Sequence, residues 1–181
     1  EGIELAGFGI PEGKDRNNIG VHDDLYVTVL ALQHLEGKIL IICADIIGFG
    51  TSFTTKIKEA IGEKFGYQEN EILLNASHTH SGPQTLEGML EGVGRQNRMY
   101  MNFLFESILS CIEEALSTME EGEFYTGKAL CGFNVNRRLI TEGRAESKPN
   151  EAGPVDKEVM VFQFTVGEKT KCVLFSYACH P

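Results

Sequence analysis

Two histidines, His78 and His80, stand two residues apart at the end of the short apolar run 71–76. Residues two apart on extended backbone point to the same side, so both imidazole rings can face one cleft. Neutral imidazole is the commonest protein ligand for zinc, and zinc held by a few protein groups lets a bound water ionise near neutral pH. The spacing suggests a zinc site, although a His-x-His pair that simply ends a strand has the same pattern.

Two further features favour the metal site. The residues Ser81, Gly82 and Pro83 follow the pair at once and predict a tight turn. A third histidine, His180, stands at the end of another apolar run, 173–179. Since sites of α/β proteins usually form at strand ends, we expect two strand ends to bring imidazoles together.

Short motifs are spread along nearly the whole chain. They are Ala-Gly-Phe-Gly at 6–9, Gly-Val-His-Asp-Asp-Leu-Tyr at 20–26, Cys-Ala-Asp at 43–45, His-Thr-His-Ser-Gly-Pro at 78–83, Asn-Arg at 136–137, Val-Asp-Lys at 155–157 and His-Pro at 180–181. In this order they resemble the N-terminal part of the catalytic domain of the neutral/alkaline non-lysosomal ceramidases, zinc amidases that cleave the N-acyl bond of ceramide. The block at 78–83 is the most specific of them.

The resemblance implies a role for each matching residue. His78 and His180 would be ligands of Zn²⁺, His80 would face the substrate near the scissile amide, and Arg137 would contact polar groups of the substrate. The remaining ligands of the family, a glutamate and a tyrosine, lie beyond Pro181. The chain would then carry half of a metal site and is expected to be inactive by itself.

One departure from the family bears on the substrate. The family usually continues the loop as Gly-Pro-Gly-Gly, whereas this chain has Gln84 and Thr85 after Pro83. The leading hypothesis is a zinc amidohydrolase that cleaves ceramide to fatty acid and sphingoid base. The exchange keeps open a different amide or ester substrate within the same chemistry. A non-catalytic module with the ceramidase-like fold is a third alternative.

Length and composition limit the partners. With 181 residues, 42% of them hydrophobic, the chain is long enough for one domain with a core, and we take 1–181 as the N-terminal portion of the catalytic domain. A net charge of -10 would repel a phosphate backbone, so nucleic acid is not expected as a partner. No apolar stretch approaches the roughly 20 residues of a transmembrane helix, and no secretory leader opens the chain. The expected partner is a small lipid-like amide, and oligomeric state is left open.

The five cysteines are odd in number and lack Cys-x-x-Cys spacing. Cys43, Cys172 and Cys179 lie within apolar runs, which predicts buried, reduced thiols. Cysteine usage therefore favours a reducing compartment, with secretion possible if a leader was removed. Asp45 ends an apolar strand, where its carboxylate would need a histidine or backbone amides as partners.

Periodicity predicts the elements that position these residues. Expected are a hairpin of 24–35 and 38–47, a helix capped by Thr51 or Ser52 and ended by Gly66, a strand at 72–76, a loop at 82–94, a helix at 96–119, a strand at 123–135, an exposed polar segment at 139–154 and a closing hairpin of 158–166 and 171–178. This order predicts an α/β fold, a mixed β-sheet sandwich covered by helices.

Overall fold

The structure is a computed structural model that describes residues 2–7, 15–87 and 94–180. Its internal contacts divide the chain into two compact units, Glu1–Met119 and Glu120–Pro181. The predicted loop 82–94 lies partly outside the described residues. Within the described part of the chain, no helix is long and apolar enough to cross a membrane.

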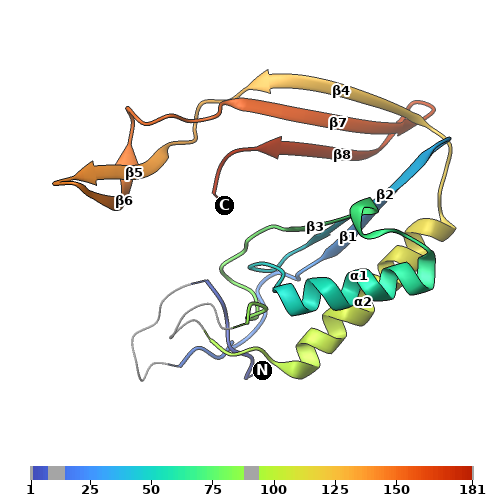
Figure 1. The fold of residues 1–181 in the computed structure, drawn as a ribbon, viewed down its shortest axis with the longest axis horizontal. Helices are drawn as coiled ribbons and strands as arrows, with labels where there is room; N and C mark the ends of the chain where they lie inside the picture. The colour runs from blue at the N-terminus through green and yellow to red at the C-terminus, as the bar shows by residue number, and fades with distance from the viewer. Residues whose placement is uncertain (1, 8–14, 88–93, 181) are drawn as a thin grey trace. The chain divides into compact units, whose positions relative to one another are not determined.

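The first unit is a three-stranded sheet with two helices (Figure 1). Its elements are β1 Val27–His34, β2 Gly37–Ala44, α1 Thr51–Phe65, the short 3₁₀ helix η1 Glu69–Glu71, β3 Ile72–Ala76 and α2 Arg98–Ser117. The sheet order is β1-β2-β3. β1 and β2 are antiparallel, whereas β2 and β3 are parallel and are joined by the crossover that contains α1. The sheet is therefore mixed, as predicted.

Local sequence explains most of these elements. The β1–β2 register pairs His34 with Gly37, which confirms the predicted hairpin. α1 ends where predicted, because Gly66 takes the left-handed conformation (φ 70°) that glycine adopts without strain. The predicted start was wrong: the N-cap of α1 is Gly50, and no side chain caps this end. Ser52 instead donates its hydroxyl to Glu87 Oε2 at 2.8 Å.

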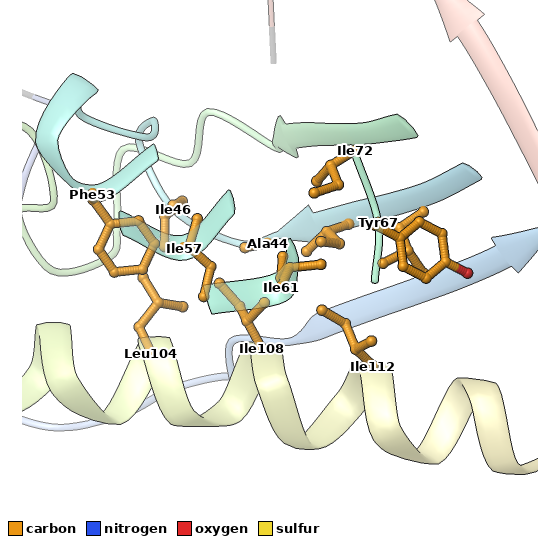
Figure 2. Close-up of a cluster of buried hydrophobic side chains, with 12 residues drawn as sticks. Ala44, Ile46, Phe53, Ile57, Ile61, Tyr67, Ile72, Leu104, Ile108 and Ile112 are labelled. Carbon is orange, nitrogen blue, oxygen red and sulfur yellow. The ribbon is translucent and has the colours of Figure 1, made fainter. Parts of the chain in front are cut away.

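One hydrophobic core joins the sheet and both helices (Figure 2). Alternate residues of β2 face it, because successive side chains of a strand point to opposite sides. Helical spacing brings residues of α1 and α2 to the same core. The fully buried members are Leu40, Ile42, Ile46, Ile57, Ile61, Ile108 and Ile112. This packing fixes the positions of the C-terminal ends of β2 and β3, and therefore the start of the segments that follow these strands.

The second unit has two antiparallel sheets. One has the order β4-β7-β8, formed by β4 Glu123–Leu130, β7 Glu158–Val166 and β8 Lys169–Tyr177, and the other pairs β5 Asn136–Thr141 with β6 Arg144–Asn150. The closing hairpin β7–β8 is as predicted, while the strand predicted for 123–135 ends at Leu130.

The predicted exposed segment 139–154 is mostly part of the β5–β6 hairpin. Its turn residues Glu142 and Gly143 both have positive φ, 53° and 75°, as a two-residue hairpin turn of type I′ requires. The strands are largely exposed and lack alternating apolar residues, so their sequence resembles that of a loop. The prediction of an α/β fold with mixed β-structure and helices is confirmed, although the strands form separate sheets.

Candidate functional site

The backbone at His78 is strained. β3 ends at Ala76, and the Ser77 amide donates to the Ala44 carbonyl at 3.0 Å, which keeps the chain beside the end of β2. His78 then has a φ of 59°, in the left-handed region that residues with a β-carbon seldom adopt. Such a conformation costs about 1–3 kcal/mol and persists where the surroundings hold it, most often at active sites and ligand clamps.

A hydrogen bond fixes the ring of His78. Its Nδ1 lies 2.7 Å from the carbonyl oxygen of Ile47, in the turn between β2 and α1. Because a carbonyl oxygen can only accept, Nδ1 carries the proton in the neutral ring and Nε2 carries the lone pair. Metal-binding histidines usually make such a bond with the nitrogen that does not ligate. The ring is therefore prepared to offer Nε2 to a metal ion.

The second histidine of the pair lies beside the first. The ring centroids of His78 and His80 are 4.9 Å apart and the ring planes are inclined by 78°. Both residues are half-buried. The two imidazoles therefore lie close together in the first unit, although the backbone at His78 is left-handed and not extended as the His-x-His spacing suggested.

Gly7 makes room for His80. The Gly7 backbone has a φ of 96°, and a β-carbon built on it would lie 2.6 Å from three atoms of His80. The N-terminal segment is held there by the Ala6 amide, which donates to Gly82 O at 2.9 Å, and by the Gln84 amide, which donates to Glu4 O at 3.0 Å. The motif at 6–9 thus contributes a glycine against the site loop, a role that sequence reasoning did not assign.

The two residues that depart from the family pattern are buried. Gln84 and Thr85 are 2% and 1% exposed. The Thr85 hydroxyl donates to Gly48 O at 2.6 Å, and the Thr85 carbonyl accepts from Gln96 Nε2 at 2.6 Å. Gln84 Oε1 accepts from the Leu86 amide at 2.9 Å. The exchange of Gly-Gly for Gln84-Thr85 therefore adds side-chain hydrogen bonds both within the loop, to Leu86, and from the loop to Gly48.

Asp45 completes the end of β2. Its Oδ2 accepts from the Tyr26 amide at 3.0 Å, and its own amide donates to the Tyr26 carbonyl at 2.9 Å. A backbone amide was one of the two partners considered for this carboxylate. Support for a metal-bound imidazole by Asp45 stays a prediction.

A cavity of about 980 Å³ lies beside the loop within the first unit. Thr79, Ser81 and Pro83 of the loop line it together with segment 17–27 and α2, and its lining is mainly apolar. Tyr100 of α2 lines it as well, and its pKa is raised, chiefly by burial and further by the nearby Asp45 carboxylate. The phenol of Tyr100 therefore stays protonated at neutral pH and can donate a hydrogen bond there.

Arg137 and His180 belong to the second unit. Arg137 is exposed on β5, beside the register shift between Asn136 and Arg138, and its Nη2 donates to Ser147 Oγ at 3.3 Å. A strand irregularity of this kind commonly re-aims a side chain. His180 is exposed after the end of β8. The convergence of His180 on His78 stays a prediction. The functional roles proposed from the sequence for His78, His80, Arg137 and His180 also stay predictions.

Asn134 holds the backbone that leads to His180. Its Nδ2 donates to Ala178 O at 2.9 Å and to Asp156 O at 2.6 Å, and its amide donates to the Tyr177 hydroxyl at 3.1 Å. Neither Asn134 nor Ile47, which holds His78, belongs to a motif with a functional reading. Their contributions depend on contacts with residues distant in sequence, so no local pattern could have identified them.

Comparison with known proteins gives a consistent result. A family model described as neutral/alkaline non-lysosomal ceramidase, N-terminal, matches residues 2–181. A neutral ceramidase of Pseudomonas aeruginosa is 29% identical over 103 residues, which cover 54% of this chain and 15% of that protein. The solved neutral ceramidase of Pseudomonas aeruginosa has a TM-score of 0.80 at 18% identity, and a ceramidase complexed with C2 has a TM-score of 0.78 at 19% identity.

The match to the solved structures extends over the whole fold. Each covers 99% of this chain, and the chain spans 29% of the length of each. Identities below one fifth leave these two matches as evidence of a shared fold alone. Membership of the family is shown by the family model, which matches residues 2–181.

Proposed function

The chain belongs to the neutral/alkaline non-lysosomal ceramidase family, and we propose that it is the N-terminal portion of a zinc-dependent amidohydrolase that cleaves the N-acyl bond of ceramide. The hydrogen bond between His78 Nδ1 and Ile47 O is the observation that carries the proposal. It gives the histidine of the most specific family motif the tautomer and orientation of a metal ligand.

His78 and His180 are the proposed ligands from this chain. His78 would bind through Nε2, and the glutamate and tyrosine that the family resemblance implies would come from elsewhere in the full-length protein. Zinc bound there would polarise the amide carbonyl and lower the pKa of a water molecule. The donor set fits the ion, because imidazole and carboxylate are common zinc ligands. With four protein ligands, a water or substrate oxygen would bind as a fifth ligand, which zinc accommodates.

His80 and Arg137 are the proposed catalytic residues. His80, whose ring centroid lies 4.9 Å from that of His78, would transfer a proton to the departing amine. Arg137 would orient the substrate, since a guanidinium makes strong charge-assisted hydrogen bonds to polar oxygens.

The cavity beside the loop supports a lipid-like substrate. Large apolar side chains line it from two segments, and several remain exposed, including Ile19 at 99%, Val21 at 75% and Phe103 at 69%. Loop residues Thr79 and Ser81 lie at the same cavity. An acyl chain could therefore bind close to the histidine pair.

The exchange at Gln84 and Thr85 favours a second candidate, an enzyme of the same chemistry with another amide or an ester as substrate. Because both side chains are buried, they would alter the pocket through the shape of the loop. A ceramidase-like module without turnover is the remaining alternative.

The full-length protein tests these candidates. Purified protein would be analysed for bound zinc and assayed with ceramides of several acyl lengths, with simple N-acyl amines and with matched esters. Hydrolysis of ceramide in preference to the other substrates is the expected result. Preference for an N-acyl amine or an ester would support the second candidate, and a zinc-loaded protein that cleaves none of them would overturn the amidohydrolase proposal.

A further inference from the structure

Thr85 and His78 are linked through two consecutive peptide groups. We infer that Thr85 is a positioning residue for His78: its buried hydroxyl fixes the turn between β2 and α1 whose Ile47 carbonyl holds Nδ1 of His78. This inference rests on the proposed role of His78 as a metal ligand, and it assigns a function to a position where the family usually has glycine.

The turn needs an anchor because of its composition. Ile47 is followed by Gly48, Phe49 and Gly50, and glycine residues restrict their backbone little. The direction of the Ile47 carbonyl depends on the peptide plane that joins Ile47 to Gly48. Rotation of that plane would carry the oxygen away from the ring of His78, which would end the 2.7 Å contact.

Thr85 supplies such an anchor from outside the turn. Its hydroxyl donates to Gly48 O at 2.6 Å, one peptide beyond the carbonyl that His78 uses. A threonine side chain has few rotamers, and at 1% exposure this one is enclosed by protein, so the hydroxyl position is well defined. Two successive carbonyls of the turn are thereby held by side chains of the loop: that of Ile47 by His78 and that of Gly48 by Thr85.

Thr85 is itself held to a rigid element. Its carbonyl accepts from Gln96 Nε2 at 2.6 Å, and Gln96 stands directly before Asn97, the N-cap of α2. The Asn97 side chain accepts from the Tyr100 amide at 3.0 Å, which fixes that helix end. A series of hydrogen bonds therefore connects the start of α2 to the ring of His78. Gln96 bonds to Thr85, Thr85 bonds to Gly48, and the preceding carbonyl, that of Ile47, accepts from His78.

Removal of the hydroxyl should act on the ring before it acts on catalysis. Without the bond to Gly48 O, the Ile47 carbonyl gains freedom, and His78 no longer has a fixed proton position. The proton can then move to Nε2, the nitrogen proposed to bind the metal. Zinc binding would have to return the proton to Nδ1, which would lower the affinity for zinc. Loss of the group that hydrogen-bonds a metal-ligating histidine typically weakens metal affinity about 10- to 100-fold, and a loosened Ile47 contact should approach the lower end of that range.

The test uses the full-length protein, three variants of Thr85 and one control variant. Thr85→Val removes the hydroxyl at nearly constant size, Thr85→Ser keeps it, and Thr85→Gly introduces the usual family residue. Ser52→Ala is the matched control, since the Ser52 hydroxyl also links the start of α1 to the loop but donates to Glu87 Oε2 at 2.8 Å, whereas the Thr85 hydroxyl donates to Gly48 O. Ring ¹⁵N chemical shifts of His78 in the metal-free, neutral state report its tautomer, and competition with a chelator reports the zinc dissociation constant.

We expect a single Nδ1-protonated tautomer in wild type, Thr85→Ser and Ser52→Ala. In Thr85→Val we expect mixed tautomers and a zinc dissociation constant about 10-fold higher. Unchanged ring shifts and affinity in Thr85→Val would overturn the inference, as would a Thr85→Ser variant that behaves like Thr85→Val. If Thr85→Val does not fold, Thr85→Gly decides by the same two measurements.

The ring measurement separates this inference from the proposed function. It is made without metal and without substrate, so wild type can show the fixed tautomer even if the protein cleaves no ceramide. Failure of the hydrolysis assay would then leave the role of Thr85 standing. Mixed tautomers in wild type would remove that role whatever the activity.

Discussion

His78 Nδ1 and the carbonyl oxygen of Ile47 are 2.7 Å apart, and they come from different segments that follow adjacent strands of one sheet. Ile47 follows β2 and His78 follows β3, and these strands are parallel, so their C-terminal ends share one edge of the sheet. The edge thus brings a backbone acceptor to the histidine of the motif. In open α/β sheets, ligands bind beyond this end of the strands.

The first prediction concerns the metal ligand. In the full-length protein, His78→Ala should bring turnover to background and lower zinc content after dialysis, because it removes a proposed ligand. His34→Ala, which changes an exposed histidine at the end of β1, is the control and should keep both. Zinc analysis and hydrolysis of a ceramide substrate check the prediction. Full zinc content in His78→Ala would show that the ligand set is wrong.

How far the sequence predicts this site depends on the range of the interactions. Helix α1 follows from the local repeat of Phe53, Ile57 and Ile61, and from Gly66. The histidine pair and its turn are equally local. The partners of His78 and His80 are not local. His78 bonds to the backbone carbonyl of Ile47, and every residue type has such a carbonyl, so the sequence does not single it out. Gly7, which makes room for His80, lies about 70 positions away from it. A one-dimensional pattern cannot show such contacts.

The missed hairpin has a different cause. β5 and β6 carry mostly polar, exposed residues, so the alternation that reveals a half-buried strand is absent. The signal that was present is the pair Glu142-Gly143, whose glycine suits a two-residue turn. Backbone pairing and turn geometry determine this hairpin, and both are weakly encoded in hydrophobicity.

The second prediction tests the contact between Gly7 and His80. Gly7→Ala should lower turnover at least about 10-fold, because the new β-carbon would lie 2.6 Å from His80 and would have to displace it. Gly2→Ala is a close control: Gly2 also has positive φ, 81°, but a β-carbon there would meet no atom within 4 Å. Kinetics and melting temperature of both variants check the prediction. Equal loss of activity in the two would assign the effect to backbone strain.

The third prediction separates Arg137 from its neighbour. Arg137→Ala should raise KM by roughly 10-fold or more with a smaller effect on kcat, because a hydrogen bond to a charged group contributes about 1.5–3 kcal/mol. Arg138→Ala changes the adjacent arginine, which is also exposed, and should leave KM within about 2-fold of wild type. Steady-state kinetics on a ceramide substrate measure both. A similar KM effect in the two variants would contradict substrate contact by Arg137.

The fourth prediction concerns pH. Hydrogen bonds from the side chain and the amide of Arg95 lower the pKa of Glu4, at 2.8 and 2.7 Å. A carboxyl whose pKa is lower in the folded state stabilises the fold above its unfolded pKa of 4.5, and that contribution is lost as the pH falls through the folded value. Glu4→Gln should therefore lower the melting temperature by about 1–2 °C at pH 7 and less at pH 3.

Melting curves of wild type, Glu4→Gln and Glu36→Gln at both pH values test this. Glu36 is exposed in the β1–β2 turn and serves as the control. The difference between wild type and Glu4→Gln should shrink on acidification, whereas the Glu36→Gln difference should stay small throughout. A Glu4→Gln difference that grows at pH 3 would reverse the sign and remove the pKa argument.

The fifth prediction addresses the approach to His180. Asn134 Nδ2 donates to Ala178 O and Asp156 O, so it ties the backbone two residues before His180 to the segment that precedes β7. Asn134→Ala removes both bonds and should weaken zinc binding by the full-length protein about 10-fold, because the proposed ligand loses its support. Asn134→Asp should behave similarly, since an ionised carboxylate cannot donate.

Asn150→Ala is the matched control for Asn134. Asn150 Nδ2 also donates to a backbone carbonyl of the second unit, Arg138 O at 2.9 Å, but it lies in the β5–β6 hairpin. Its removal should lower stability without a comparable change in the zinc dissociation constant, measured by chelator competition. If Asn150→Ala weakens zinc binding as much as Asn134→Ala, the effect belongs to general loosening of the unit. Unchanged affinity in Asn134→Ala would mean that the backbone before His180 needs no such support, or that His180 is not a ligand, and His180→Ala distinguishes these two outcomes.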